Sequence, residues 1–230
     1  MRTSLTRAAT LTAAAVLLAT AAAPASAADG AGGAHREVGQ SITVPLREAI
    51  GRLTVADEDR TGYVRTAFKH WVDADKDGCD ARKEVIKAEA LEAPAQGPRC
   101  ALTGGVWLSL YDDVVVTDAG RLDVDHLVPL AEAWDSGASA WSAAERQAYA
   151  NDLDEARALI AVTAASNRSK ADKDPADWLP PAAAYRCTYL TDWVAIKTRW
   201  SLSVDTREQQ ALTDIAAGCT DTDITVTLAR

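Results

Sequence analysis

The chain has 230 residues, of which 48% are hydrophobic and 25% charged, and its formal net charge is −9. Its apolar content excludes wholesale disorder, and its length suits one domain or a small pair. The acidic balance argues against a general polyanion-binding surface but is compatible with a local basic cleft.

Residues 1–27 have the pattern of a signal peptide. Arg2 and Arg7 precede an Ala/Leu/Val run, and Ala25-Ser26-Ala27 offers small residues for cleavage. An uncleaved anchor is the alternative, but a membrane helix needs about 20 strongly apolar residues and this run is shorter and mostly Ala. We therefore expect a secreted, extracellular monomer with no stable membrane association, a flexible leader at 28–40 and one domain at 41–230.

The mature chain is expected to be an α+β, mostly helical single domain. Alternating or β-branched runs predict strands at 106–111, 114–117, 121–126 and 159–162. Apolar spacings of three and four predict helices at 45–53, 63–71, 84–91, 129–134, 142–150, 192–200 and 206–217. Ser142 with Glu145 predicts a capping box, and Asp205 is a candidate helix cap.

Four cysteines in an oxidising compartment predict two disulfides. They are Cys79, Cys100, Cys187 and Cys219. Three connectivities are possible, and we favour the local pairs Cys79–Cys100 and Cys187–Cys219 because each pair brackets one region. A four-cysteine zinc site is the alternative, but the chain lacks the CxxC spacing that such sites use.

An ordered set of residues stands out in the second half of the chain. Asp125-His126 ends a predicted strand and Pro129 follows it; much further on, a second strand leads into Asn167 and Lys170. The order DH-x-x-P, strand, N-x-x-K resembles the HNH endonuclease family. Further segments resemble secreted HNH proteins related to the C-terminal domain of GmrSD-type restriction enzymes, over roughly residues 63–219. These segments are A-W-D-S-G-A at 133–138, A-N-D-L at 150–153 and D-K-D-P-A-D-W-L-P at 172–180.

The resemblance implies a ββα-metal core and a hydrolytic site around one divalent cation. Phosphodiester hydrolysis needs a base with a pKa near neutrality, and imidazole supplies one. By resemblance, His126 is the general base, and Asp125 and Asn167 hold the metal, Mg²⁺ or Mn²⁺, with Zn²⁺ also considered. Arg168, Lys170 and Lys173 form a local basic cluster expected to bind substrate phosphates. For an isolated Asp-His dipeptide the simpler interpretation would be a surface ion pair at a turn.

Two departures from the family pattern bear on this interpretation. Many members carry an Asn nine residues before the Asn167 position, where this chain has Ala158. The Asn that ties down the loop behind the general base must therefore come from elsewhere, with Asn151 as a candidate, or be absent. Many members also carry zinc-binding cysteines at the positions of Thr163 and Ser166, and the disulfides are expected to replace that bracing.

A separate acidic loop matches the EF-hand pattern D-x-D-x-D-G-x5-E. Its expected calcium ligands are Asp73, Asp75, Asp77 and Glu84. An acidic turn without an ion is the simpler alternative, and a third is that Asp80 and Arg82 border the catalytic cleft. His70-Trp71, just before the loop, is expected to pack rather than to bind a metal.

The sequence thus favours a secreted, metal-dependent HNH endonuclease that cuts DNA, or RNA, with little sequence preference. The alternative is a non-catalytic secreted calcium-binding or interaction module that keeps the HNH fold, which Ala158 would favour. A toxin-like nuclease is a third option, although no delivery domain is visible.

Overall fold

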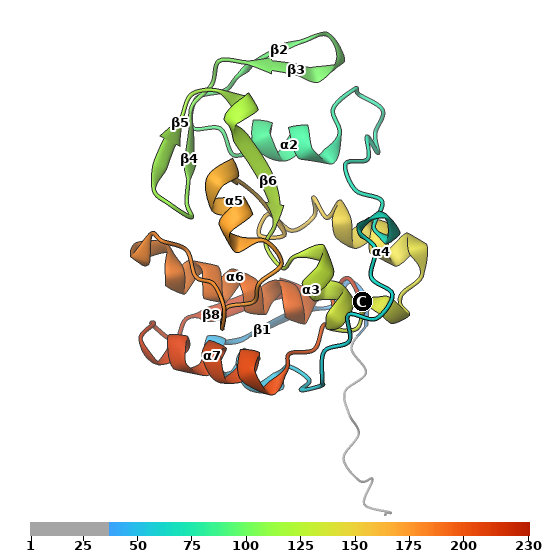
Figure 1. The fold of residues 1–230 in the computed structure, drawn as a ribbon, viewed down its shortest axis with the longest axis vertical. Helices are drawn as coiled ribbons and strands as arrows, with labels where there is room; N and C mark the ends of the chain where they lie inside the picture. Colours follow the sequence, from blue (N-terminus) through green and yellow to red (C-terminus); the bar gives the residue numbers. More distant parts are fainter. Residues whose placement is uncertain (1–36) are drawn as a thin grey trace, which may run out of the picture. The chain divides into compact units, whose positions relative to one another are not determined.

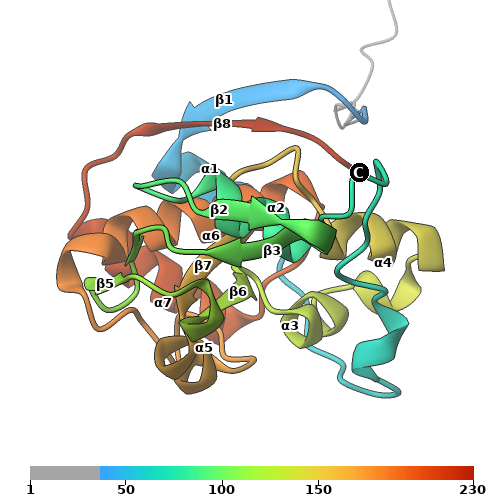
Figure 2. The same ribbon diagram turned by 90° about the horizontal axis from the view of Figure 1, so that it is seen from above.

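The computed structural model describes residues 37–230. The predicted signal peptide and most of the leader lie outside this range. The first strand, β1 (Ser41–Pro45), pairs antiparallel with the last, β8 (Asp223–Thr227). Alternate residues of each strand are buried, so one face of this ribbon covers the core and the other faces solvent (Figure 2). The sequence prediction missed both strands.

Two strands and one helix form the centre of the described unit. β6 (Leu122–His126) pairs antiparallel with β7 (Leu159–Thr163) in the register His126 to Leu159. α5 (Ala164–Lys170) follows β7 at once, because the Thr163 side chain accepts a hydrogen bond from the Ser166 amide and caps the helix. α5 packs against both strands, and α2 (Ala81–Ala88) also contacts them (Figure 1). This pairing brings the two ends of the predicted motif, 45 residues apart in sequence, next to each other.

Helices cover the end of β6 that carries His126. α3 (Leu130–Asp135) begins directly after Pro129, and α4 (Ala143–Ala150) begins with the predicted capping box. The longest helix within residues 37–230, α6 (Arg186–Arg199), is buried on most of its surface between α1 (Leu46–Arg52), α7 (Thr206–Ala217) and β8 (Figure 1). Asp205 caps α7, as expected.

Two small hairpins complete the described structure. They are β2 (Ala95–Gly97) with β3 (Ala101–Thr103), and β4 (Trp107–Ser109) with β5 (Val114–Val116). The disulfides join Cys79 to Cys100 and Cys187 to Cys219, which are the favoured pairs. The first links the acidic loop to the β2–β3 hairpin, and the second links α6 to the end of α7.

The fold is mixed α and β, as expected, with strands in pairs rather than in one large sheet. The helix predicted at 63–71 is wrong: only one 3-10 turn forms, η1 (Arg65–Ala67), and Trp71 has a positive φ of 58°. The apolar spacing there arises because Phe68 and Trp71 pack inward from an irregular segment. The helix predicted at 84–91 begins earlier, at Ala81, because Asp80 caps it. Among the described residues, no helix is long and apolar enough to cross a membrane.

Candidate active site

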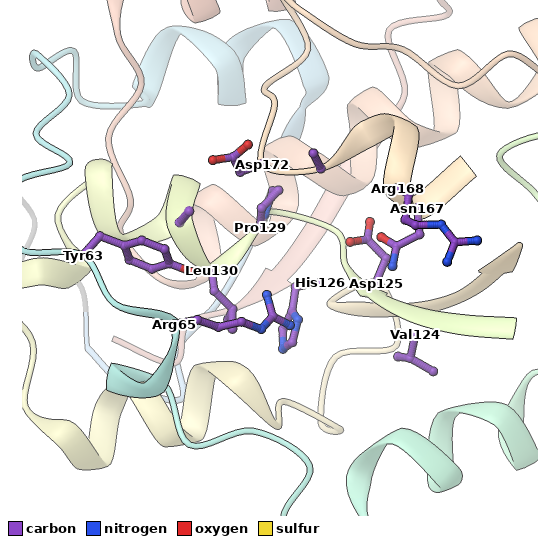
Figure 3. Close-up of a pocket in the computed structure, with 12 residues that line it drawn as sticks. Tyr63, Arg65, Val124, Asp125, His126, Pro129, Leu130, Asn167, Arg168 and Asp172 are labelled. Carbon is purple, nitrogen blue, oxygen red and sulfur yellow. The ribbon is translucent and has the colours of Figure 1, made fainter. Parts of the chain in front are cut away.

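The end of β6 lies in a pocket of about 460 Å³. Asp125 and His126 both line it, although neighbouring strand residues point to opposite faces. The two side chains leave the strand toward different neighbours, Asp125 toward the end of α5 and His126 toward the end of α4. Because β6 ends at His126, the pocket extends across the strand end and reaches both of them (Figure 3).

His126 is held as a neutral base. Its ring is only 5% exposed, and Nε2 lies 2.9 Å from the carbonyl oxygen of Ala150. A carbonyl oxygen only accepts hydrogen bonds, so Nε2 carries the proton and Nδ1 keeps a lone pair. Burial, together with the nearby positive charges of Arg65 and Lys170, lowers the pKa of His126 to about 3. The imidazole is therefore neutral at any ordinary pH, but a pKa this low makes it a weaker base than the near-neutral pKa expected from the sequence.

The ring of His126 packs against His70 and Trp71, in the segment that precedes the acidic loop. Trp71 stacks on it with ring centroids 5.2 Å apart, and His70 lies at its edge, so this pair packs as expected. The Asn151 side chain accepts a hydrogen bond from the Val72 amide and donates to the carbonyl of Lys69, at 2.8 Å each. Asn151 thus ties this segment to the end of α4, next to the carbonyl that orients His126.

Asp125 is also held in place, by two hydrogen bonds. It is 6% exposed, and its Oδ2 accepts hydrogen bonds from the Tyr111 hydroxyl at 2.7 Å and from the Lys170 ammonium at 2.6 Å. Burial raises the pKa of Asp125 and lowers that of Lys170, whereas their contact favours the charged form of each. Because Oδ2 already accepts two hydrogen bonds, Oδ1 is the carboxylate oxygen left to coordinate a metal ion in the pocket.

Asn167 lies on α5 and lines the same pocket, beside Asp125 (Figure 3). Its side-chain nitrogen donates a hydrogen bond to Asp123 Oδ2 at 3.1 Å, which leaves its side-chain carbonyl oxygen available to coordinate a metal ion. Asp125 and Asn167 together thus offer two oxygen ligands. Such a set fits Mg²⁺ or Mn²⁺, which keep several waters, better than Zn²⁺, which prefers four nitrogen or sulfur ligands.

The predicted basic cluster does not act as one group. Arg168 lines the pocket, but Lys170 is fully buried in its contact with Asp125 and has no surface with which to bind substrate. Lys173 lies outside the pocket lining and donates to the carbonyl of Ser169.

The structure adds two pocket residues that no motif marks, Tyr63 and Arg65. They come from the irregular segment around η1, so neither periodicity nor spacing indicated them. Of the residues considered near the cleft, Asp80 caps α2 and Arg82 donates to the carbonyl of Leu122, and neither lines the pocket.

Comparison with known protein families gives a match over most of the chain. Residues 66–215 match the family described as GmrSD restriction endonucleases, C-terminal domain. The chain belongs to this family. The match spans every residue of the candidate site except Tyr63 and Arg65.

The chain also resembles an "Uncharacterized secreted protein" of Arthroderma benhamiae, with 39% identity over 171 residues, or 74% of this chain and 82% of the relative. This secreted relative and the two disulfides confirm the expected extracellular location. No solved structure matches the chain. Membership of an endonuclease family indicates a hydrolase of the nuclease type.

Proposed function

We propose that this protein is a secreted endonuclease that hydrolyses phosphodiester bonds of DNA or RNA with little sequence preference. The observation that carries the proposal is the fixed tautomer of His126, whose Nδ1 lone pair is available at the end of β6 beside Asp125. His126 takes the proton of the attacking water. The oxygen–phosphorus bond that forms replaces the bond to the departing sugar oxygen, which leaves with a proton from solvent.

Asp125 and Asn167 would hold the divalent cation, with Mg²⁺ or Mn²⁺ favoured over Zn²⁺. When bound, the cation supplies positive charge that stabilises the phosphate and the departing oxygen. Lys170 and Tyr111 keep Asp125 in place, and the link from Asn167 to Asp123 directs its carbonyl oxygen. Ala158 does not remove the support behind the base, because the Ala150 carbonyl and Asn151 supply contacts there.

The test is plasmid cleavage by the mature, oxidised protein with Mg²⁺, Mn²⁺ or Zn²⁺, beside an EDTA control. Wild-type protein should nick the plasmid with Mg²⁺ or Mn²⁺, and His126→Ala should lose at least about 100-fold in rate, as expected for removal of a general base. Lys173→Ala is the matched control, because Lys173 lies outside the pocket and should leave the rate unchanged. Cleavage that survives His126→Ala would overturn the mechanism.

We propose in addition that the acidic loop binds Ca²⁺ as a structural ion. Carboxylate oxygens of Asp73, Asp75 and Asp77 lie within 4.8 Å of one another, and Asp73 Oδ1 is buried without a hydrogen-bond partner. Gly78, at the sharp turn, has a φ of +98°. Glu84 lies within 4.8 Å of Asp77 in a second group, whose third member, Cys79, forms a disulfide. The helix α2 follows the loop, whereas an irregular segment replaces the first EF-hand helix. A non-catalytic calcium-binding module remains the second candidate if cleavage fails.

A further inference from the structure

The pocket has two chemically different ends. One end holds Asp125, Asn167 and Arg168, and is polar and charged. The other, mainly apolar end is lined by Tyr63, Pro129, Leu130 and Ala131, together with the carboxylate of Asp172. Arg65 reaches between the two ends, and its guanidinium points toward His126 in Figure 3.

Arg65 is well placed to bind an anion. It is exposed and, within residues 37–230, has no carboxylate at ion-pair distance, in contrast to Arg60, which pairs with Asp135 and Asp172. Its charge is near enough to lower the pKa of both His126 and Asp125. Arg168 also lines the pocket, from α5, but in Figure 3 its guanidinium lies on the far side of Asp125 and Asn167 from His126, so Arg65 is the guanidinium beside the base that can bind a phosphate.

Tyr63 offers a flat, apolar surface beside that phosphate position. Arg60 lies over its ring at 5.6 Å, and Trp134 packs against it at 6.0 Å, so the ring is held in one orientation. Figure 3 shows the ring directed toward Leu130 across the apolar end. An aromatic ring next to a guanidinium is the arrangement that binds one base and its phosphate in single strands.

We propose that Tyr63 and Arg65 form a nucleotide subsite that takes one unpaired base next to the scissile phosphate, and that the substrate is single-stranded nucleic acid. This inference rests on the proposed nuclease function. It places substrate recognition in a segment just before the part of the chain that matches the family.

Two further observations favour a single strand over a duplex. Asp125 and His126 are only 6% and 5% exposed, so the phosphate must enter the pocket, which a flexible strand does more readily than a stiff double helix. A base stacked on Tyr63 has left the stack of its own strand, which a single strand permits at least cost.

Binding and cleavage are measured separately with one fluorescent 12-nucleotide DNA, alone or annealed to its complement. Affinity is measured by anisotropy in EDTA with the wild-type protein, and cleavage is measured with Mg²⁺ or Mn²⁺. The single strand should bind and be cleaved at least about 10-fold better than the duplex. Tyr63→Leu, which keeps apolar volume without a ring, should weaken single-strand binding about 5- to 100-fold, and Tyr63→Phe should restore it.

Arg65→Gln should weaken binding about 10-fold and reduce the slope of log affinity against log salt by about 0.7. Arg99→Gln is the matched control, since Arg99 is exposed, has no ion pair among the described residues and lies outside this pocket. Equal binding and cleavage of both DNAs, or no effect of Tyr63→Leu, would overturn the subsite while leaving the nuclease intact. Single-strand binding that depends on Tyr63, without any cleavage, would instead overturn the nuclease and support the subsite.

Discussion

The ammonium group of Lys170 has two acceptors in the protein, Asp125 Oδ2 at 2.6 Å and the carbonyl of His126 at 3.1 Å. It therefore joins the side chain of one proposed site residue to the backbone of the next. In sequence, Lys170 looks like a phosphate ligand because it follows Asn167 and Arg168. Its burial gives it a different role, that of positioning Asp125.

Lys170→Met should destabilise the protein by about 3–5 kcal/mol, because it leaves the Asp125 carboxylate buried without its counter-ion. Adding Asp125→Asn should recover much of that loss, since the double variant contains neither buried charge. Urea unfolding of both single variants and the double variant measures the coupling. Lys173→Met is the control on the same segment and should change the free energy of unfolding by less than about 0.5 kcal/mol. A loss below about 1 kcal/mol for Lys170→Met would contradict a tight ion pair.

At the scale of elements, Glu89 joins α2 to β7. It directly follows the helix, and its Oε2 accepts a hydrogen bond from the Ala161 amide of β7 at 2.9 Å. Burial raises the pKa of Glu89 from 4.5 to about 7, although this hydrogen bond opposes the shift. The folded state therefore binds the proton more tightly than the unfolded state. The stability that this proton provides is complete below about pH 4.5 and is lost as the pH rises through 7.

Glu89→Gln should leave stability nearly unchanged at pH 5 and raise it at pH 8 by on the order of 1–2 kcal/mol, because the amide accepts the same hydrogen bond without a charge. Thermal unfolding from pH 5 to 8 measures this difference. Glu92→Gln is the control, because Glu92 is exposed and should give parallel curves. The assigned burial of Glu89 would be wrong if the stability difference did not grow with pH.

The elements also show which parts of the fold can be predicted from the sequence alone. The capping box at Ser142, the turn at Asp112-Asp113 and the strand ending at His126 were predicted, because each depends on neighbouring residues. The β1–β8 ribbon was missed because its partners are 186 residues apart, and local patterns carry no information about that pairing.

The residues of the candidate site likewise divide into those that local sequence predicts and those that it does not. Asp125, His126, Asn167 and Arg168 were named from an ordered motif, and the structure brings all four to one pocket. Arg65 could not be named, because it reaches the pocket from an irregular segment whose path no local pattern predicts.

At the scale of the whole molecule, the distribution of charge matters more than its sum. The net charge is −9, yet several arginines outside the pocket are neutralised locally: Arg157 by Glu155, Arg199 by Asp152 and Arg207 by Asp177. Arg65 and Arg168 line the pocket without such partners among the described residues. An acidic protein can thus present a local cationic site, where low-dielectric walls concentrate the field.

The acidic loop links ion binding to the stability of the whole unit, because the Cys79–Cys100 disulfide and α2 hold it against the rest of the fold. An unpaired loop of this kind should bind Ca²⁺ with a Kd of about 10⁻⁴–10⁻³ M. Since the ion binds only the folded loop, 5 mM Ca²⁺ should add about 1–2 kcal/mol to the free energy of unfolding and raise Tm by about 2–8 °C. The same concentration of Mg²⁺ should have a much smaller effect.

Scanning calorimetry of the wild type and of the double variant Asp75→Asn/Asp77→Asn tests this expectation. The double variant should lose the Ca²⁺ response, because it removes two of the negative charges that attract the ion. Asp57→Asn, which changes one exposed carboxylate outside the loop, should keep the response. If Ca²⁺ and Mg²⁺ shift Tm equally in all three proteins, the effect is general screening of the net negative charge and the loop is an acidic turn held by the disulfide.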